Sequence, residues 1–464
     1  MNRRILGLAL PNIITNITVP LLGMVDTAIM GHLSEEGLGA IAIGASLFNL
    51  IYWNFGFLRM GTSGITAQAY GARRWDEAVK TLVRACTIAL GIAMALIVLQ
   101  WPIGLLVPVI FEGSDKVLAM ALTYFQVRIW AAPATLGLYA IKGWFIGMQD
   151  SKTPMWIAIA LNIVNIIFSL LFVLVFHWDI AGVALGTVVA QYSGLAMGIF
   201  FLRRKFRNEE LRMKNEESAD ATNHSALFLL HSSFLKESLR WAEMRRFFKV
   251  NGDIFLRTVC LSAVFTFITA AGSHISDEVL AVNNLLMQFF TLFSYIMDGF
   301  AYAGESLVGR YIGAREAKNL RSAVRLLIVW GLVLTVVFTG AYAVGGEWFL
   351  AIFTDQQAVI DAAGDYLFWA LIVPVCGFAA FLFDGIFIGA TASRSMRNAM
   401  FVATAAFFAV YYGLKALNAP LDTLTWNNIL WTAFMVFLTL RGLLQWMRLR
   451  KDVYGQVETK TFAS

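Results

Sequence analysis

One ionisable side chain lies inside the first hydrophobic stretch of the chain, residues 5–30: the carboxylate of Asp26. The stretch is long enough to cross a bilayer once as a helix, which takes about 20 apolar residues. A charged side chain near the middle of a membrane helix costs roughly 2.5–3.5 kcal/mol on insertion scales, so it is usually kept for a function. Pro11 and Pro20 each remove a backbone donor from the same stretch and crowd the preceding turn. The sequence therefore predicts a titratable group on a helix that can bend.

Other polar side chains are expected to gather around this carboxylate. Asn12, Asn16 and Gly23 fall on the same helical face as Asp26, because residues three and four apart are neighbours on a helix. An alternative stays open, because pairing with Arg128 would make Asp26 part of a static ion pair. Asn165, Ser169 and Thr187 are expected at a similar or slightly greater depth in the membrane than Asp26. Tyr124 and Arg128 are expected to enter from the outer end of the fourth span.

The composition excludes a soluble globular protein. Of 464 residues, 59% are hydrophobic and only 14% are charged, and the mean hydropathy is +0.68. The net charge of +6 does not indicate a nucleic-acid-binding protein, because the basic residues fall in particular connections between hydrophobic stretches. Cys86, Cys260 and Cys376 lie inside such stretches and have neither metal-site nor disulfide spacing. We therefore expect a membrane protein without a cofactor or a metal.

Twelve hydrophobic stretches are long enough to be membrane helices, so the expected fold is an all-α integral membrane protein. Lysine and arginine are concentrated in alternate connections, and the other connections are mainly acidic. By the positive-inside rule, both termini are cytoplasmic. The expected spans are residues 5–30, 38–68, 79–107, 117–147, 154–176, 180–201, 247–272, 279–308, 322–344, 362–389, 398–417 and 427–447.

The longest polar connection, residues 203–246, follows the sixth stretch. It divides the chain into an N-terminal lobe of residues 1–202, a cytoplasmic linker and a C-terminal lobe of residues 247–464. The later part of the linker mixes aromatic and basic residues and could lie on the anionic inner leaflet of the membrane. We favour the simpler interpretation, a tether between the lobes.

The two halves of the chain are related by an internal repeat. A shift of 242 positions aligns residues 32–36 with 274–278, 71–73 with 313–315 and 143–147 with 385–389, without a gap. One shared offset for three separated matches argues against coincidence. Because six spans is an even number, both halves enter the membrane in the same direction. Parallel repeats imply a pseudo-twofold axis along the membrane normal and a central cavity between two lobes, as in many secondary transporters.

The second half carries buried charges that the repeat does not share. At the 242-residue offset, Asp26 falls on Ile268 and Pro11 falls on Asp253. Two interpretations stay open for these charges: a network that holds the lobe together, or a second cation site. The residues concerned are Asp253, Arg257, Asp298, Glu305 and Asp384, within expected reach of Arg59 and Lys142.

Several long runs of the sequence are similar to a known family. They resemble multidrug and toxic compound extrusion (MATE) transporters of the DinF subfamily, and the resemblance extends over nearly the whole chain. It implies a V-shaped pair of six-helix lobes that export lipophilic, often cationic compounds in exchange for protons or sodium ions. The runs are LALPNIITNITVPLLGMVDTAIMGHL, GITAQAYGAR, DGFAYAGESLVGRYIGAR and DGIFIGATASRSMRNAM.

The resemblance also implies roles for individual residues. Asp26 matches the proton-coupling carboxylate of the family, and Pro11 matches the proline at which the first helix bends on protonation. Asn165 and Thr187 match polar cavity positions on the fifth and sixth helices. Some relatives carry an aspartate four residues after the asparagine, where this chain has Ser169. A relay of two carboxylates is therefore not expected, and Asp26 would act largely alone.

Other functions were weighed against an exporter. An intramembrane enzyme would need a zinc-binding pair, a paired-aspartate motif or a glycine before Asp298, and the sequence has none of these. A flippase for lipid-linked precursors should hold pyrophosphate with basic residues, whereas the buried charges here are mainly acidic. Sodium could replace the proton as the coupling ion. We expect a monomeric, proton-coupled exporter of drug-like or amphiphilic small molecules in the bacterial inner membrane, with no nucleic-acid partner.

Overall fold

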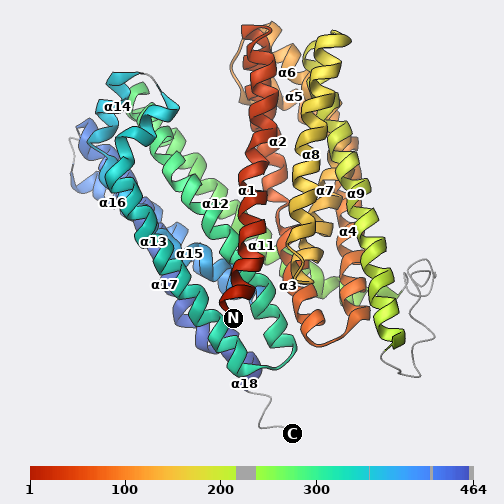
Figure 1. Ribbon diagram of the computed structural model, residues 1–464. Helices are drawn as coiled ribbons and strands as arrows, with labels where there is room; N and C mark the ends of the chain where they lie inside the picture. The colour runs from red at the N-terminus through yellow and green to blue at the C-terminus, as the bar shows by residue number, and fades with distance from the viewer. Residues whose placement is uncertain (216–236, 355, 419–421, 459–464) are drawn as a thin grey trace. The chain divides into compact units, whose positions relative to one another are not determined.

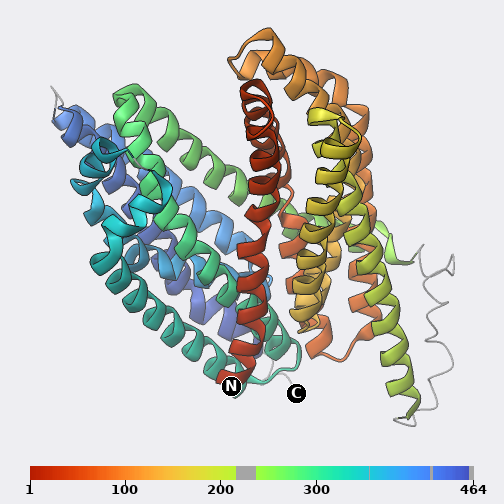
Figure 2. The ribbon, with the colours of Figure 1, turned by 45° about the horizontal axis from the view of Figure 1, so that its top comes forward.

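The computed structural model in Figures 1 and 2 describes residues 1–215, 237–354, 356–418 and 422–458. These residues form helices and connecting turns, and none of them lies in a strand. Twelve helical segments among them are long and apolar enough to cross a membrane. The expected all-α membrane fold with twelve spans is therefore confirmed.

The helices fall into two runs along the chain. The helices before residue 216 are α1 (Asn2–Gly31), α2 (Glu35–Asn54), α3 (Phe57–Gly71), α4 (Trp75–Val98), α5 (Gln100–Ile110), α6 (Asp115–Arg128), α7 (Ala132–Gly147), α8 (Lys152–Leu170) and α9 (Asp179–Asn215). The helices after residue 236 are α11 (Trp241–Ile275), α12 (Asp277–Gly313), α13 (Ala317–Phe353), α14 (Gln357–Gly364), α15 (Leu367–Gly389), α16 (Ser393–Leu417), α17 (Thr423–Leu449) and α18 (Gly455–Glu458).

The expected third span, residues 79–107, is two helices in the structure. The first of them, α4, ends at Val98, and α5 begins at Gln100. Pro102 lies in the first turn of α5, where the N–H that proline lacks has no helical partner in any case. A proline at this point starts a new helix more readily than it continues the old one.

The sixth and seventh expected spans are both longer in the structure. α9 continues to Asn215, and α11 begins at Trp241, before the expected start at residue 247. Much of the expected linker is therefore helical where the structure describes it. Residues 216–236, which include the first half of the segment considered for membrane contact, lie outside the described residues.

Contacts within the chain define two compact units. The N-terminal unit comprises Ile14–Thr66 and Arg74–Lys249, and the C-terminal unit comprises Met1–Ile13, Ala67–Arg73 and Val250–Ser464. In the N-terminal unit, α8 and α9 run side by side (Figures 1 and 2), and in the C-terminal unit α12 packs along α15. α1, α3 and α11 each change units partway along the helix.

Local backbone geometry recurs at the 242-residue offset. Ser34 and Ser276 occupy equivalent positions, and each side chain accepts a hydrogen bond from the first turn of the following helix, α2 and α12 respectively. A positive φ is uncommon for residues other than glycine, so its recurrence at equivalent positions supports the repeat. The equivalent pairs with positive φ are Arg73 and Arg315, both at 57°, and Gln149 and Thr391, at 61° and 51°.

Equivalent glycines also allow close helix packing in both halves. Gly143 on α7 lies against the backbone carbonyl of Arg59, and Gly385 on α15 lies against the carbonyl of Ala301. A Cβ atom at either glycine would overlap that carbonyl oxygen. The two halves therefore repeat a helix contact that only glycine permits.

Candidate functional site

Asp26 lies in the interior of the N-terminal unit and is only 1% exposed. The Thr187 hydroxyl donates to Asp26 Oδ2 at 3.1 Å, and Asn165 Nδ2 donates to Asp26 Oδ1 at 3.4 Å. Asn165 Nδ2 also contacts Thr187 Oγ1 at 3.1 Å and Ser169 Oγ at 3.3 Å. The structure thus brings together four of the residues that the sequence singles out, around one carboxylate.

Three helices supply these side chains. Asp26 is on α1, Thr187 is on α9, and Asn165 and Ser169 lie one turn apart on α8. Gly186, next to Thr187, faces Ser169, whose side chain a Cβ at residue 186 would overlap. The missing side chain lets α9 approach α8 closely enough for Thr187 to reach both Asn165 and Asp26.

The donors to Asp26 are neutral, and one acceptor beside it is unused. Asn165 Oδ1 is buried and accepts no hydrogen bond from the residues that the structure describes. Buried polar atoms are normally satisfied, so an unused carbonyl oxygen beside a carboxylate marks a place for a water molecule or a cation. The arrangement can solvate an ionised carboxylate, and it can also accept a proton or a small cation.

Arg128 does not form the static ion pair considered for Asp26. Its guanidinium donates to Tyr124 Oη and lies over the ring of Phe48, 4.8 Å from the centroid. Within the described part of the chain, no ion pair joins Arg128 to Asp26, although Arg128 is near enough to act on Asp26 electrostatically and the Tyr124 hydroxyl is within hydrogen-bonding reach of it. Gly44 on α2 makes room for the Tyr124 ring. Tyr124 therefore lies buried between a cation and the candidate site.

The polar residues expected on one face of α1 (Asn12, Asn16 and Asp26) do not all belong to the same unit. Asn12 belongs to the C-terminal unit, and its side chain donates to the Leu8 carbonyl at 2.9 Å. Asn16 belongs to the N-terminal unit with Asp26 and is half-buried. Pro11 is buried two residues before the boundary, and α1 is helical through it.

Asp384 is the centre of a charge cluster in the C-terminal unit. Arg257 donates to Asp384 Oδ2, Arg441 Nη2 donates to the same oxygen at 2.7 Å, and Gln445 Nε2 donates to Oδ1 at 2.8 Å. All four side chains are buried. Asp384 and Arg257 were expected among the buried charges of the second half, whereas Arg441 and Gln445 were not. An arginine inside an otherwise apolar expected span, residues 427–447, was the signal for Arg441.

Asp253 belongs to a different cluster from Arg257, although the two lie one turn apart on α11. The Ser393 hydroxyl donates to Asp253 Oδ2 at 2.9 Å, and Arg397 Nη1 donates to Oδ1 at 2.6 Å. Among the remaining charges of α12, Glu305 is buried and Asp298 is half-buried. No group of three or more metal-ligating side chains comes together in the described part of the chain.

The fold and the candidate site together indicate a class of membrane protein. Twelve candidate membrane helices in two repeats, with a buried carboxylate on a proline-containing helix, are features of a secondary transporter. The family model described as MatE matches residues 11–171 and 254–412, so its two matches begin close to the 242-residue offset. The chain belongs to the MATE family of membrane transporters.

Individual relatives agree with this assignment. DNA damage-inducible protein F of Escherichia coli (strain K12) is 37% identical over 439 residues, covering 94% of this chain and 89% of that protein. Protein DETOXIFICATION 44, chloroplastic, of Arabidopsis thaliana is 24% identical over 450 residues, covering 94% of this chain and 80% of that protein. A crystal structure of a MATE protein in the bent conformation has a TM-score of 0.80 at 16% identity, covering 100% of this chain and 97% of that one.

Proposed function

We propose that the protein is a multidrug efflux antiporter that exports lipophilic, often cationic compounds in exchange for protons, and that Asp26 carries the exchanged proton. The observation that carries the proposal is the environment of Asp26, which is buried on α1 with neutral donors from Asn165 and Thr187. A buried carboxylate with no ion pair is costly to keep charged and is readily neutralised by a proton. The relatives support the export function, because two Neisseria meningitidis proteins similar to this chain are described as probable multidrug resistance proteins.

The proposed cycle couples the charge of Asp26 to the shape of α1. Protonation removes the charge that Asn165 and Thr187 solvate, so their contacts rearrange. Pro11 leaves the Gly7 carbonyl without its helical donor, so α1 can bend there at little cost. The membrane potential adds about 2.3 kcal/mol per charge per 100 mV to inward proton movement. Proton and substrate then favour different states of one helix, which is sufficient for exchange.

Sodium coupling is the second candidate, and the unused Asn165 Oδ1 favours it. Together with Asp26, Ser169 and Thr187, this atom would give a cluster of oxygen ligands, which hard cations prefer. A water molecule in the same place would serve proton coupling equally well, so the geometry alone supports both ions.

We assign the Asp384 cluster to structure and not to ion coupling. Two guanidinium groups and one amide already saturate this carboxylate, and a cation would have to displace an arginine from it. The same saturation weakens the flippase alternative, because Arg257 and Arg441 are engaged by Asp384 and are not presented to a phosphate group.

Transport into proteoliposomes with separately imposed proton and sodium gradients tests the function. Tetraphenylphosphonium, a lipophilic cation, is the probe. We expect a proton gradient to drive its movement, with an exposed carboxylate variant, Asp115→Asn, behaving as the wild type does. Probe movement driven by the sodium gradient alone would identify sodium as the coupling ion in place of the proton. Probe movement with neither gradient would contradict antiport.

We also propose that the repeats act as lobes of residues 1–202 and 247–464, joined by residues 203–246. The monomer lies in the bacterial inner membrane with both termini in the cytoplasm, as the alternation of basic connections indicates. A topology reporter fused after Ser464 should be active only on the cytoplasmic side. Activity on the outer side would contradict the orientation.

A further inference from the structure

The first residues of α11 are built into the N-terminal unit, although α11 begins the second repeat. The residues responsible, named here the α11 anchor, are Glu237 and Ser238, just before α11, and Glu243 and Phe247, in its first turns. Ser238 is fully buried, and its carbonyl accepts a hydrogen bond from Arg84 Nε on α4 at 2.8 Å. Phe247, only 2% exposed, packs with Ala85 and Ala140.

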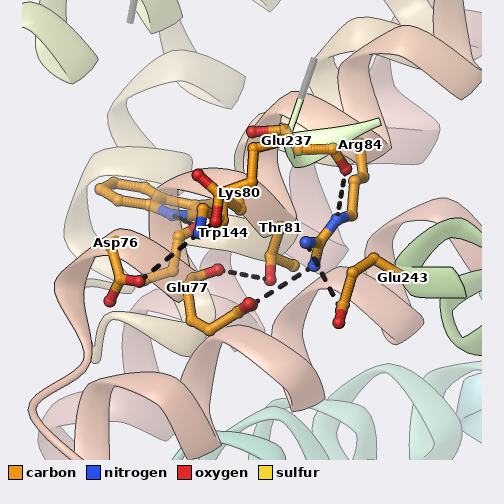
Figure 3. Close-up of polar contacts among 10 residues, drawn as sticks. Asp76, Glu77, Lys80, Thr81, Arg84, Trp144, Glu237 and Glu243 are labelled. Carbon is orange, nitrogen blue, oxygen red and sulfur yellow. Dashed lines mark hydrogen bonds and ion pairs between the residues drawn. The ribbon is translucent and has the colours of Figure 1, made fainter. Parts of the chain in front are cut away.

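Ion pairs surround this contact (Figure 3). Lys80 Nζ donates to Glu237 Oε1 at 2.7 Å, and Arg84 Nη2 lies 3.6 Å from Glu243 Oε2. Arg84 Nη1 also pairs with Glu77 Oε2 at 3.3 Å, so the buried guanidinium is held from both helices. Trp144 Nε1 donates to the Ala78 carbonyl at 2.9 Å, which fixes α4 to α7 beneath the cluster.

The acidic partners in this cluster are at least partly exposed, but the Arg84 guanidinium that they hold is buried. Separating Arg84 from its partners would leave a charge in a site that is only 4% exposed. The anchor therefore combines a buried guanidinium, a backbone acceptor and a buried aromatic side chain, so it is more than a pair of exposed surface charges.

The same helix leaves the N-terminal unit after Lys249, so it must accommodate any movement between the units. α11 is continuous from Trp241 to Ile275, and Val250 is its first residue in the C-terminal unit. Gly252 follows two residues later, and no atom lies within 4 Å of the place where its Cβ would be. Glycine lowers helix stability by about 1 kcal/mol relative to alanine, so the helix is weakest next to the boundary.

The first helix of the other repeat, α1, also passes from one unit to the other. α1 begins in the C-terminal unit and continues in the N-terminal unit after Ile13, the reverse of α11. Ile5, which is fully buried, is equivalent to Phe247 at the 242-residue offset, and Leu10 and Pro11 are equivalent to Gly252 and Asp253. The first helix of each repeat, α1 or α11, therefore begins in the unit to which most of the other repeat belongs. In each helix a residue that weakens it, Pro11 in α1 and Gly252 in α11, follows shortly after its start.

We propose that the α11 anchor stays closed throughout transport and that α11 bends beside Gly252, as the counterpart of the bend in α1. The proposal rests on the export function above, because only a transport cycle requires the units to move. Bending of α11 at Gly252, and not opening of the α11 anchor, then sets the rate at which the units move.

Cross-linking tests whether the anchor stays closed. Lys80→Cys and Glu237→Cys, in a chain whose three cysteines (Cys86, Cys260 and Cys376) are replaced by alanine, would be joined by a reducible bifunctional thiol reagent. The matched control joins Glu36→Cys and Lys116→Cys, which replace an exposed ion pair of 2.8 Å within the same unit. We expect both cross-linked proteins to export at rates within about twofold of the unlinked ones. Export that stops only in the 80–237 protein, and returns on reduction, would overturn the proposal.

Stiffening α11 tests the bend itself. Gly252→Ala should slow export about fivefold, the ratio that corresponds to the helix-propensity difference between the two residues. Gly340→Ala is the matched control, because Gly340 also has no atom within 4 Å and its helix, α13, stays within one unit. Equal rates in the two variants would contradict the proposed bend.

A distance measurement separates this proposal from the proposed function. Spin labels at Trp241→Cys and Val259→Cys lie on exposed positions that flank Gly252, about 27 Å apart along a straight helix. We expect a second, shorter distance to become populated when the pH is changed from alkaline to acidic, and Gly252→Ala to suppress it. A single distance under both conditions would overturn the bend, whether or not the protein exports the probe. Absence of export by the wild type would instead contradict the proposed function.

Discussion

At the scale of single residues, the molecule treats two buried carboxylates in opposite ways. Asp26 receives hydrogen bonds from a threonine and an asparagine, and Asp384 receives them from two arginines and a glutamine. Neutral donors leave a carboxylate able to exchange a proton, whereas two guanidinium groups hold it ionised. We therefore propose a coupling role for this residue type in one unit and a structural role in the other.

The structural role of Asp384 predicts a large loss of stability in Asp384→Ala. The substitution leaves Arg257 and Arg441 buried without their shared acceptor, which costs about 3–5 kcal/mol when one partner of a buried pair is removed. Thermal unfolding of the purified protein in detergent would measure the loss. Asp361→Ala, at an exposed position, should change stability by less than about 0.5 kcal/mol. Equal midpoints for the two variants would show that the cluster does not hold the unit together.

The residues around Asp26 could be predicted from the sequence, because each of them is a polar residue inside an expected apolar span. Depth along those spans was enough to group Asn165, Ser169 and Thr187 with Asp26, and the structure places the four in contact. It could not find the Asp384 cluster as a whole, because α11, α15 and α17 meet only through tertiary packing. The pairing of Asp253 with Arg397 was hidden for the same reason, because α11 and α16 also meet only through tertiary packing.

At the scale of helices, α1 is the element that we propose links the site to movement. It carries Asp26 in one unit and Pro11 in the other, and it is helical between them. Helix periodicity and proline content were visible in the sequence. The division of α1, α3 and α11 between two units was not, because it depends on which helices pack together and not on any local pattern.

Pro11→Ala should restore the missing backbone hydrogen bond and make α1 harder to bend. One net hydrogen bond of about 1 kcal/mol corresponds to a roughly fivefold slower export rate. Pro20→Ala is the matched control, because Pro20 lies on α1 well inside the N-terminal unit. Initial rates of tetraphenylphosphonium export by proteoliposomes would decide. A Pro11→Ala protein as fast as the wild type would remove Pro11 from the mechanism.

Close packing of α15 on α12 makes Gly385 a second sensitive position at this scale. Gly385→Ala would force the added methyl group onto the Ala301 carbonyl, and overpacking of this kind costs about 1–3 kcal/mol. Gly413→Ala, where no atom lies within 4 Å, should leave stability unchanged or slightly improved. Thermal unfolding in detergent distinguishes the two. Similar stability for both variants would mean that α12 and α15 can separate without cost.

At the scale of the whole molecule, the repeat explains both the likeness and the difference of the two halves. Helix caps, left-handed turns and glycine contacts recur at one offset, whereas the buried charges do not. A common scaffold therefore carries a different polar interior in each half. The offset was visible in the sequence because short turns and glycines tolerate few replacements, and the family model finds the same two segments.

The central claim is that Asp26 carries the proton that is exchanged for substrate, and proton release on binding tests it most directly. Tetraphenylphosphonium would be added to purified protein in weakly buffered solution with a pH-sensitive dye. We expect the wild type to release protons with the same concentration dependence as binding, and the Asp26→Asn protein to fold and bind the probe but release none. Equal proton release from the Asp26→Asn protein would contradict the claim.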